Sequence, residues 1–134
     1  MLFRSGLCFL MVEAVDAVDV TTLASVLAGS ANAGGDHADL ENAVLLDVRE
    51  PWEFELASIK DSVNIPMSTL TGRVDEVRAL QPSADTPIVL ICHHGIRSMQ
   101  CARYLAGQGI DHLINLTGGI EAWSTQVDPA LPRY

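Results

Sequence analysis

Residues 86–109, TPIVLICHHGIRSMQCARYLAGQG, join a strand pattern to a helix pattern through one short loop. The first part, 86–92, is a continuous apolar run that ends at Cys92, and such runs are typical of strands buried in a parallel sheet. The last part changes to helical periodicity, with one apolar face formed by Cys101, Ala102, Leu105 and Ala106. The stretch therefore predicts a strand–loop–helix unit with Cys92 at the carboxyl end of the strand.

The rest of the chain repeats this alternation of strands and helices. Further strands are predicted at 15–20, 43–48 and 112–116, with a strand-like connection at 59–67. Helices are predicted from Thr22 to about Leu27 with Thr21 as its cap, from Pro51, from Ser68 or Thr69 to Pro82, and over 118–123. Such alternation predicts an α/β fold with a mostly parallel sheet and helices on both faces. Ligand sites in these sheets form outside the carboxyl ends of the strands, where Cys92 is expected.

The loop after Cys92 has the composition of an anion site. Backbone amides at a helix N-terminus have no partner within the helix and, together with the helix dipole, attract negative charge. Gly95 permits the backbone conformation of a tight loop, and Arg97 adds a planar cation. Because the thiolate is the nucleophilic form of cysteine and is favoured in such surroundings, we expect Cys92 to attack, accept and pass on a group. His93 and His94 could supply donors or protons.

Less specific roles stay open for these residues. Cys92 could be a small buried hydrophobe, and the two histidines could only line the loop. No metal is expected, because side chains adjacent in sequence rarely converge on one ion and the spacing differs from zinc motifs. Cys101 is expected to face the core, with a role as resolving thiol as the alternative.

Composition narrows the range of partners. The 134 residues include 8 basic and 17 acidic side chains, for a net charge of −9, which argues against nucleic acid and anionic membrane surfaces. The three cysteines, one of them Cys8, are too few and odd in number for a disulfide framework, so a reducing compartment, the cytoplasm, is expected. Residues 1–13 are expected to be a poorly ordered extension before one domain over 14–134.

Three segments resemble the signature regions of the rhodanese, or thiosulfate sulfurtransferase, family: LLDVREPWEFELASIKDSVNIPM, VLICHHGIRS and NLTGGIEAW. The resemblance covers roughly residues 14–134, a whole single-domain rhodanese. It implies a five-stranded parallel sheet between helices. It also implies a sulfurtransferase that moves sulfane sulfur from a donor such as thiosulfate to cyanide or a thiol, with no metal or organic cofactor. A sulfur-relay protein is a further implied partner.

The resemblance assigns roles to individual residues. Cys92 would form a persulfide, and the loop that follows would bind substrate through His93, His94, Gly95, Ile96 and Arg97, with Ser98 in support. Asp47 would hold this loop, and Arg49 would support the site from the neighbouring strand end.

Other residues would shape the surroundings of the loop. Arg49 and Glu50 have an alternative as a simple surface pair, although the resemblance makes Glu50 the cap of the helix that begins at Pro51. Gly118 and Gly119 would turn the last strand into its helix, and Trp123 would pack that helix.

Loop length separates the related enzyme classes. Rhodanese-like phosphatases and arsenate reductases hold a larger tetrahedral oxyanion in a loop one residue longer, so the shorter loop from Cys92 to Arg97 favours sulfur. The alternatives are such a phosphatase or arsenate reductase, a non-catalytic rhodanese-like binding module, and a sulfur carrier. The residues between Cys92 and Gly95 differ from those of well-studied thiosulfate and mercaptopyruvate enzymes, which leaves the donor open.

Overall fold

The computed structural model describes residues 15–29 and 40–134, in which strands and helices alternate along the chain. The elements are β1 (Val15–Asp19), α1 (Val20–Leu27), β2 (Val44–Asp47), α2 (Pro51–Leu56), β3 (Val63–Asn64), α3 (Met67–Leu70), α4 (Val74–Leu80), β4 (Ile88–Ile91), α5 (Ile96–Gly107), β5 (Leu113–Thr117) and α6 (Gly119–Gln126). The strands form one five-stranded sheet in the order β1-β5-β4-β2-β3, with every neighbouring pair parallel. The predicted α/β fold is confirmed, and the predicted extension, 1–13, lies outside the described residues.

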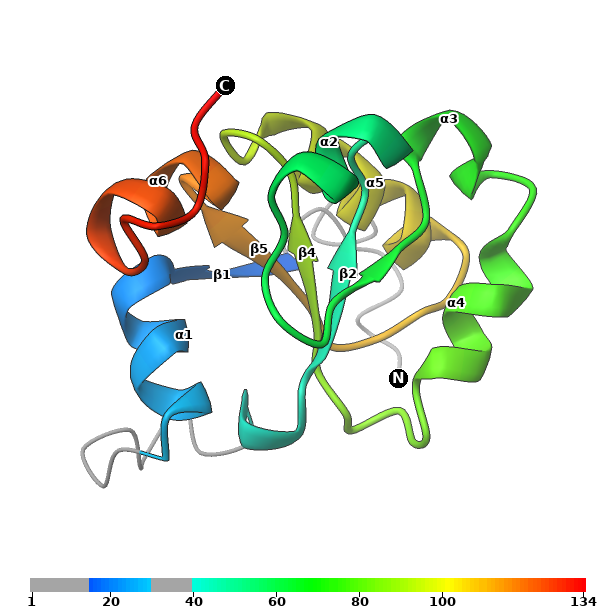
Figure 1. The fold of residues 1–134 in the computed structure, drawn as a ribbon. Coiled ribbons are helices and arrows are strands. Elements are labelled where there is room, and N and C mark those ends of the chain that lie inside the picture. The colour runs from blue at the N-terminus through cyan, green and yellow to red at the C-terminus, as the bar shows by residue number, and fades with distance from the viewer. Residues whose placement is uncertain (1–14, 30–39) are drawn as a thin grey trace.

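The sheet separates two hydrophobic cores, because successive residues of a strand point to opposite faces. From β4, Val89 and Ile91 enter the core shared with α1 and α6, whereas Ile88 and Leu90 enter the core shared with α4 and α5. Figure 1 shows these two groups of helices on opposite sides of the sheet. Because all four residues of β4 are buried, the strand that leads into Cys92 is a rigid support.

Two details of the predicted helices are wrong. The helix expected from Ser68 or Thr69 to Pro82 is two helices, α3 and α4, with Gly72 in the break between them. Glycine costs a helix interior about 1 kcal/mol relative to alanine, and here the Arg73 N–H closes a turn onto the Leu70 carbonyl at 2.9 Å.

The cap of α1 is also different from the prediction. Asp19, not Thr21, is the N-cap, and its Oδ1 accepts a hydrogen bond from the Thr22 N–H at 2.8 Å. The helix consequently begins directly after β1, at Val20. Among the residues that the structure describes, no helix is long and apolar enough to cross a membrane.

Candidate active site

Cys92 lies directly after β4, at the carboxyl edge of the sheet, and the loop reaches α5 at Ile96. Gly95 has φ +105°, the left-handed region that favours glycine, and this turns its N–H back to donate to Cys92 Sγ at 3.0 Å. Cys92 itself is 1 % exposed. The predicted loop amides therefore include one, from Gly95, that already points at the sulfur.

A buried polar network continues from the thiol to the neighbouring strand. Cys92 Sγ lies 3.2 Å from Ser98 Oγ, Ser98 donates to Asn115 Oδ1 on β5, and Asn115 Nδ2 donates to the Gly95 carbonyl at 3.1 Å. Because the one hydroxyl proton of Ser98 goes to Asn115, the Ser98 oxygen is the acceptor of a hydrogen bond from the thiol. The network closes a ring around the loop and places Ser98 beside Cys92, while its supporting role in the reaction stays a prediction.

Arg97 was expected to add a cation to the loop, and in the structure this cation is bound to Glu53. Its Nη1 and Nη2 atoms donate to the two carboxylate oxygens of Glu53, both at 2.9 Å. Such two-point pairs are strong and geometrically specific. The hydrogen bonds to Glu53 raise the pKa of Arg97 above its ordinary value, so the cation is permanent but its charge is matched.

Glu53 is the centre of this arrangement although no sequence motif singled it out. Its carboxylate also accepts the Glu50 N–H at 2.9 Å and the Tyr134 hydroxyl at 3.0 Å. Glu53 is buried, and the hydrogen bonds from Arg97 lower its pKa to about 2. As expected, Glu50 is the N-cap of α2, with Pro51 in the first helical position.

Asp47 and Arg49 form a second ion pair beside the loop. Both are fully buried, and their closest approach is 2.6 Å, so the alternative of Arg49 and Glu50 as a surface pair is wrong. The side-chain hydrogen bonds of Asp47 among the described residues all go to Arg49, not to the Cys92 loop. The expectation that Asp47 holds this loop directly is therefore wrong.

Arg49, which is paired with Asp47, connects this ion pair to α2 and to Tyr134. Its guanidinium donates to the carbonyls of Glu53 and Ala57 and to the Tyr134 hydroxyl at 2.7 Å. These bonds fix α2, and α2 in turn holds Glu53 against Arg97.

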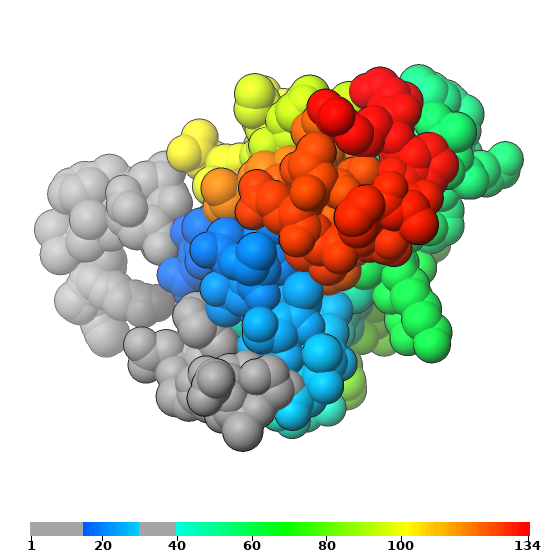
Figure 2. Space-filling model, turned by 60° about the vertical axis from the view of Figure 1, so that its left-hand side comes forward, coloured from blue at the N-terminus to red at the C-terminus, as the bar shows by residue number. Residues whose placement is uncertain are grey.

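Tyr134 covers the loop from the outside. Its ring stacks on His93, with ring centroids 4.2 Å apart and an interplanar angle of 8°. His93 stacks in turn on His94 at 4.1 Å. Figure 2 shows the C-terminal segment (red) against α6 and the residues near α2. Burial lowers the pKa of His93, so His93 is neutral near pH 7.

Backbone N–H groups at the N-terminus of α6 donate hydrogen bonds to the same loop. Gly118 and Gly119 have φ values of +83° and +59°, as expected for a tight turn, and Trp123 is buried in the core beneath α6. The Ile120 N–H donates to the Cys92 carbonyl at 2.8 Å, and the Glu121 N–H donates to the His93 carbonyl at 3.0 Å. A Cβ on Gly119 would lie 2.3 Å from the Cys92 oxygen, so only glycine permits this approach.

His93, His94 and Glu121 are the described residues whose grouping could suit a metal ion, with ligand atoms within 4.8 Å of one another. The two imidazoles are stacked 26° from parallel, so their in-plane lone pairs do not point at a common centre. Glu121 is also paired with Arg133 at 2.5 Å. The geometry is that of packing and ion pairing, and we assign no metal to it.

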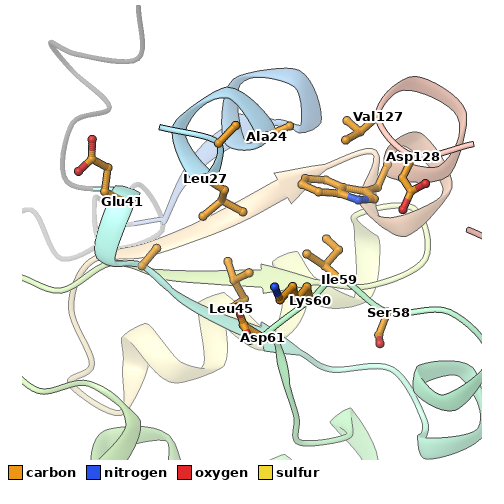
Figure 3. A pocket seen from close by; sticks show the side chains of 13 residues that line it. Ala24, Leu27, Glu41, Leu45, Ser58, Ile59, Lys60, Asp61, Val127 and Asp128 are labelled. Carbon is orange, nitrogen blue, oxygen red and sulfur yellow. The ribbon is translucent and has the colours of Figure 1, made fainter. Parts of the chain in front are cut away.

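A cavity of about 620 Å³ lies between α1, β2, the connection at 58–61 and the C-terminal end of α6. Figure 3 shows Leu27, Leu45 and Ile59 at its wall and Lys60 at its edge. None of the loop residues 92–98 lines it, so this cavity is separate from the thiol.

The chain matches the family model described as Rhodanese-like domain over residues 30–126. The chain belongs to this rhodanese family. The rhodanese relative GlpE of Pseudomonas syringae, named thiosulfate sulfurtransferase, is 38 % identical, over 63 % of this chain and 76 % of its own length. The crystal structure of reduced CoADR-RHD of Bacillus anthracis matches with a TM-score of 0.68 at 27 % identity, over 90 % of this chain and 18 % of that one.

Other rhodanese relatives are much longer proteins. The Rhodanese-like/PpiC domain-containing protein 12, chloroplastic, of Arabidopsis thaliana is 41 % identical, over 74 % of this chain and 33 % of its own length. The adenylyltransferase and sulfurtransferase MOCS3 of the same plant is 34 % identical, over 70 % of this chain and 23 % of its own length. The chain thus spans a third or less of these two relatives.

Proposed function

We propose that this rhodanese domain is a sulfurtransferase that carries sulfane sulfur as a persulfide on Cys92. The observation that supports the proposal best is the Gly95 N–H, which donates to Cys92 Sγ at 3.0 Å from a loop at the carboxyl end of β4. A donor in this position favours negative charge on sulfur, both on the thiolate and on the persulfide that follows it.

The reaction proceeds by attack of the Cys92 thiolate on the outer sulfur of a donor. The bond between the two donor sulfurs breaks, its electron pair leaves with the remainder of the donor, and Cys92 gains one sulfur. The Cys92 thiol releases its proton to solvent before attack, and the Ser98 oxygen, whose own proton is held by Asn115, orients the sulfur. A thiol or cyanide then attacks the outer sulfur of the persulfide and restores Cys92.

A phosphatase or arsenate reductase is the second candidate from the same architecture. The tetrahedral oxyanion needs space and several free donors around the cysteine, whereas Cys92 is 1 % exposed and Arg97 is bound to Glu53. These two features favour transfer of a single sulfur atom. A non-catalytic binding module has no need of the network from Cys92 through Ser98 to Asn115.

A protein partner and a reducing compartment fit the same chemistry. One relative is named adenylyltransferase and sulfurtransferase MOCS3, and on that basis we infer that a protein of a sulfur relay is a candidate acceptor besides small thiols. The free thiols of Cys92 and Cys101 suit a reducing compartment such as the cytoplasm.

Intact mass spectrometry tests the reaction. The reduced protein is offered thiosulfate and, separately, cysteine persulfide, and we expect a mass gain of one sulfur atom that cyanide removes. Cys92→Ser should gain nothing, whereas the matched control Cys101→Ser should gain the sulfur as the wild type does. Release of phosphate from an aryl phosphate, without any sulfur gain from either donor, would contradict the proposal.

A further inference from the structure

We propose that the sulfur donor of this site is an alkyl persulfide, R–S–SH, rather than thiosulfate. The inference rests on the proposed persulfide chemistry of Cys92 and names the class of donor that the site accepts. Three observations carry it: the pairing of the nearby cations, the burial of the thiol, and the exposed apolar side chains beside the loop.

The cations around the loop are matched by anions. Thiosulfate is a dianion and leaves as sulfite, also a dianion, so its binding and departure gain more from unpaired cations than those of a donor with less charge. Arg97 is bound at two points by Glu53, Arg49 is paired with Asp47, and Arg133 is paired with Glu121. His93, which lies in the loop beneath the Tyr134 ring, is neutral near pH 7 because burial lowers its pKa.

The charge of the whole molecule adds to this local balance. At a net charge of −9, the protein repels a dianion more strongly than a singly charged or neutral donor, and salt screens the repulsion. After an alkyl persulfide has given up its outer sulfur, the remainder leaves as the thiolate R–S⁻ with one negative charge. The Gly95 N–H and the helix N-terminus can stabilise this single charge without an unpaired guanidinium.

The burial of the thiol favours the same donor. With Cys92 only 1 % exposed, the sulfur to be transferred must reach the thiol at the end of a narrow group. In an alkyl persulfide the outer sulfur is terminal on an unbranched chain, whereas in thiosulfate it is bonded directly to a bulky sulfonate head.

Apolar side chains are available for the organic part of the donor. Ile96, the first residue of α5 after the loop, is 70 % exposed, and Trp52, whose ring meets Tyr134 edge-on at 5.8 Å, is 62 % exposed. Exposed large apolar side chains beside a reactive group suit contact with a carbon-containing substrate and offer nothing to a small inorganic dianion.

The step is balanced without an oxidant or reductant. The Cys92 thiolate forms a bond to the outer sulfur of R–S–SH, the S–S bond of the donor breaks, and its electron pair leaves on R–S⁻. The products are Cys92–S–SH and the thiolate of the donor, which takes up the proton that Cys92 released to its surroundings.

Single-turnover loading of the wild-type protein tests the assignment. The rate of sulfur gain on Cys92 is measured by intact mass with cysteine persulfide and with thiosulfate, at the same pH and ionic strength. Each rate is divided by the rate of that donor with a free small thiol, so that the intrinsic reactivity of the donor cancels. We expect the normalised rate with cysteine persulfide to be higher by about tenfold or more, and added salt to raise the thiosulfate rate more steeply.

A matched pair of variants tests the role of the cation. Glu53→Gln removes the negative charge that is paired with Arg97. The variant should raise the normalised thiosulfate rate and so lower the ratio of the cysteine persulfide rate to the thiosulfate rate. Glu76→Gln is the control, because Glu76 forms a similar two-point pair with Arg73 on the surface, with distances of 2.8 and 2.9 Å. It should leave the ratio unchanged.

The outcomes separate this inference from the proposed function. A normalised thiosulfate rate equal to or above that of cysteine persulfide in the wild type would overturn the donor assignment and leave the sulfurtransferase intact. If neither donor loads Cys92, the proposed function itself fails. Should Glu53→Gln not fold, the wild-type ratio and its salt dependence still decide the question.

Discussion

The Tyr134 side chain contacts the Cys92 loop through its ring and the Arg49–Glu53 segment through its hydroxyl. The contributions of the hydroxyl and of the ring to stability can be separated. Tyr134→Phe keeps the stack on His93 but removes the hydrogen bonds to Arg49 and Glu53, which should lower the free energy of unfolding by about 1–3 kcal/mol because the partners are buried. Urea unfolding measures this loss. Tyr104→Phe, on α5, is the control and should have little effect.

Removal of the ring makes a separate prediction. Tyr134→Ala uncovers His93, and since burial is the main cause of the lowered pKa of His93, that pKa should rise toward its ordinary value. An NMR titration of the His93 ring protons follows the change, with His112 as an internal reference. An unchanged His93 titration in Tyr134→Ala would show that the stack does not shield this histidine.

Cys101 differs from Cys92 in its reactivity. Both are buried next to the same core, but burial raises the pKa of Cys101 to about 12, so Cys101 is a neutral thiol near pH 7. We expect iodoacetamide at pH 7–8 to label Cys92 and leave Cys101 unmodified in the folded protein, as peptide mass spectrometry would show. Fast labelling of Cys101 would restore the alternative of a resolving thiol.

For single residues, the sequence predicted contacts between neighbours in the Cys92 loop better than contacts that other parts of the chain make with the loop. Gly95 and Ser98 follow from the pattern around Cys92, because their contacts are local. Glu53 and Tyr134 were missed, since both reach the loop from distant parts of the chain. Asn115 had a usable signal, as the polar residue in the apolar run HLINL, because a buried amide in a strand requires partners.

Among the elements, the junction between β5 and α6 offers the sharpest prediction. Gly119→Ala would place a Cβ at a φ of +59° and 2.3 Å from the Cys92 oxygen, so the variant should lose several kcal/mol of stability or fail to fold. Chemical denaturation with accessibility of the Cys92 thiol measures the effect.

Gly107→Ala, at the end of α5, is the matched control for Gly119→Ala. A Cβ there meets nothing within 4 Å, so this variant should be neutral or more stable by up to about 1 kcal/mol. Equal stabilities of the two variants would contradict the close approach of α6 to the loop.

The elements themselves were predictable where periodicity was long and undisturbed. The buried run of β4 and the apolar face of α5 determined both elements from the sequence. The break between α3 and α4 was not predicted. The helical spacing of Val74, Val77 and Leu80 is undisturbed after Arg73, and the turn at Gly72 gives only a weak local signal. Likewise Asp19 and Thr21 are both good N-cap residues, and the register of β1 decides between them.

For the whole molecule, the pair of Glu53 and Arg97 links stability to pH. Since the pKa of Glu53 falls from 4.5 to about 2 on folding, its contribution is fully present above the unfolded value and is lost as the pH falls through about 2. The size of that contribution is on the order of 3 kcal/mol. Stability measured between pH 2 and 7 should therefore fall less steeply in Glu53→Gln than in the wild type.

The exposed carboxylate of Glu76 provides the comparison for this pH dependence. Glu76→Gln removes the same charge from a surface pair, where solvent screens the interaction, so its acid profile should remain close to that of the wild type. Superimposable profiles for all three proteins would show that Glu53 is not the group that links folding to protons.

The hydrogen bonds from Ile120 and Glu121 to the carbonyls of Cys92 and His93 have a consequence for protein synthesis. The ribosome releases Cys92 well before it releases the segment, residues 118–121, that completes the backbone support of Cys92. A nascent chain that stalls between these two points holds an unsheltered thiol, open to oxidation. Its exposure ends only when the late glycine turn emerges and docks.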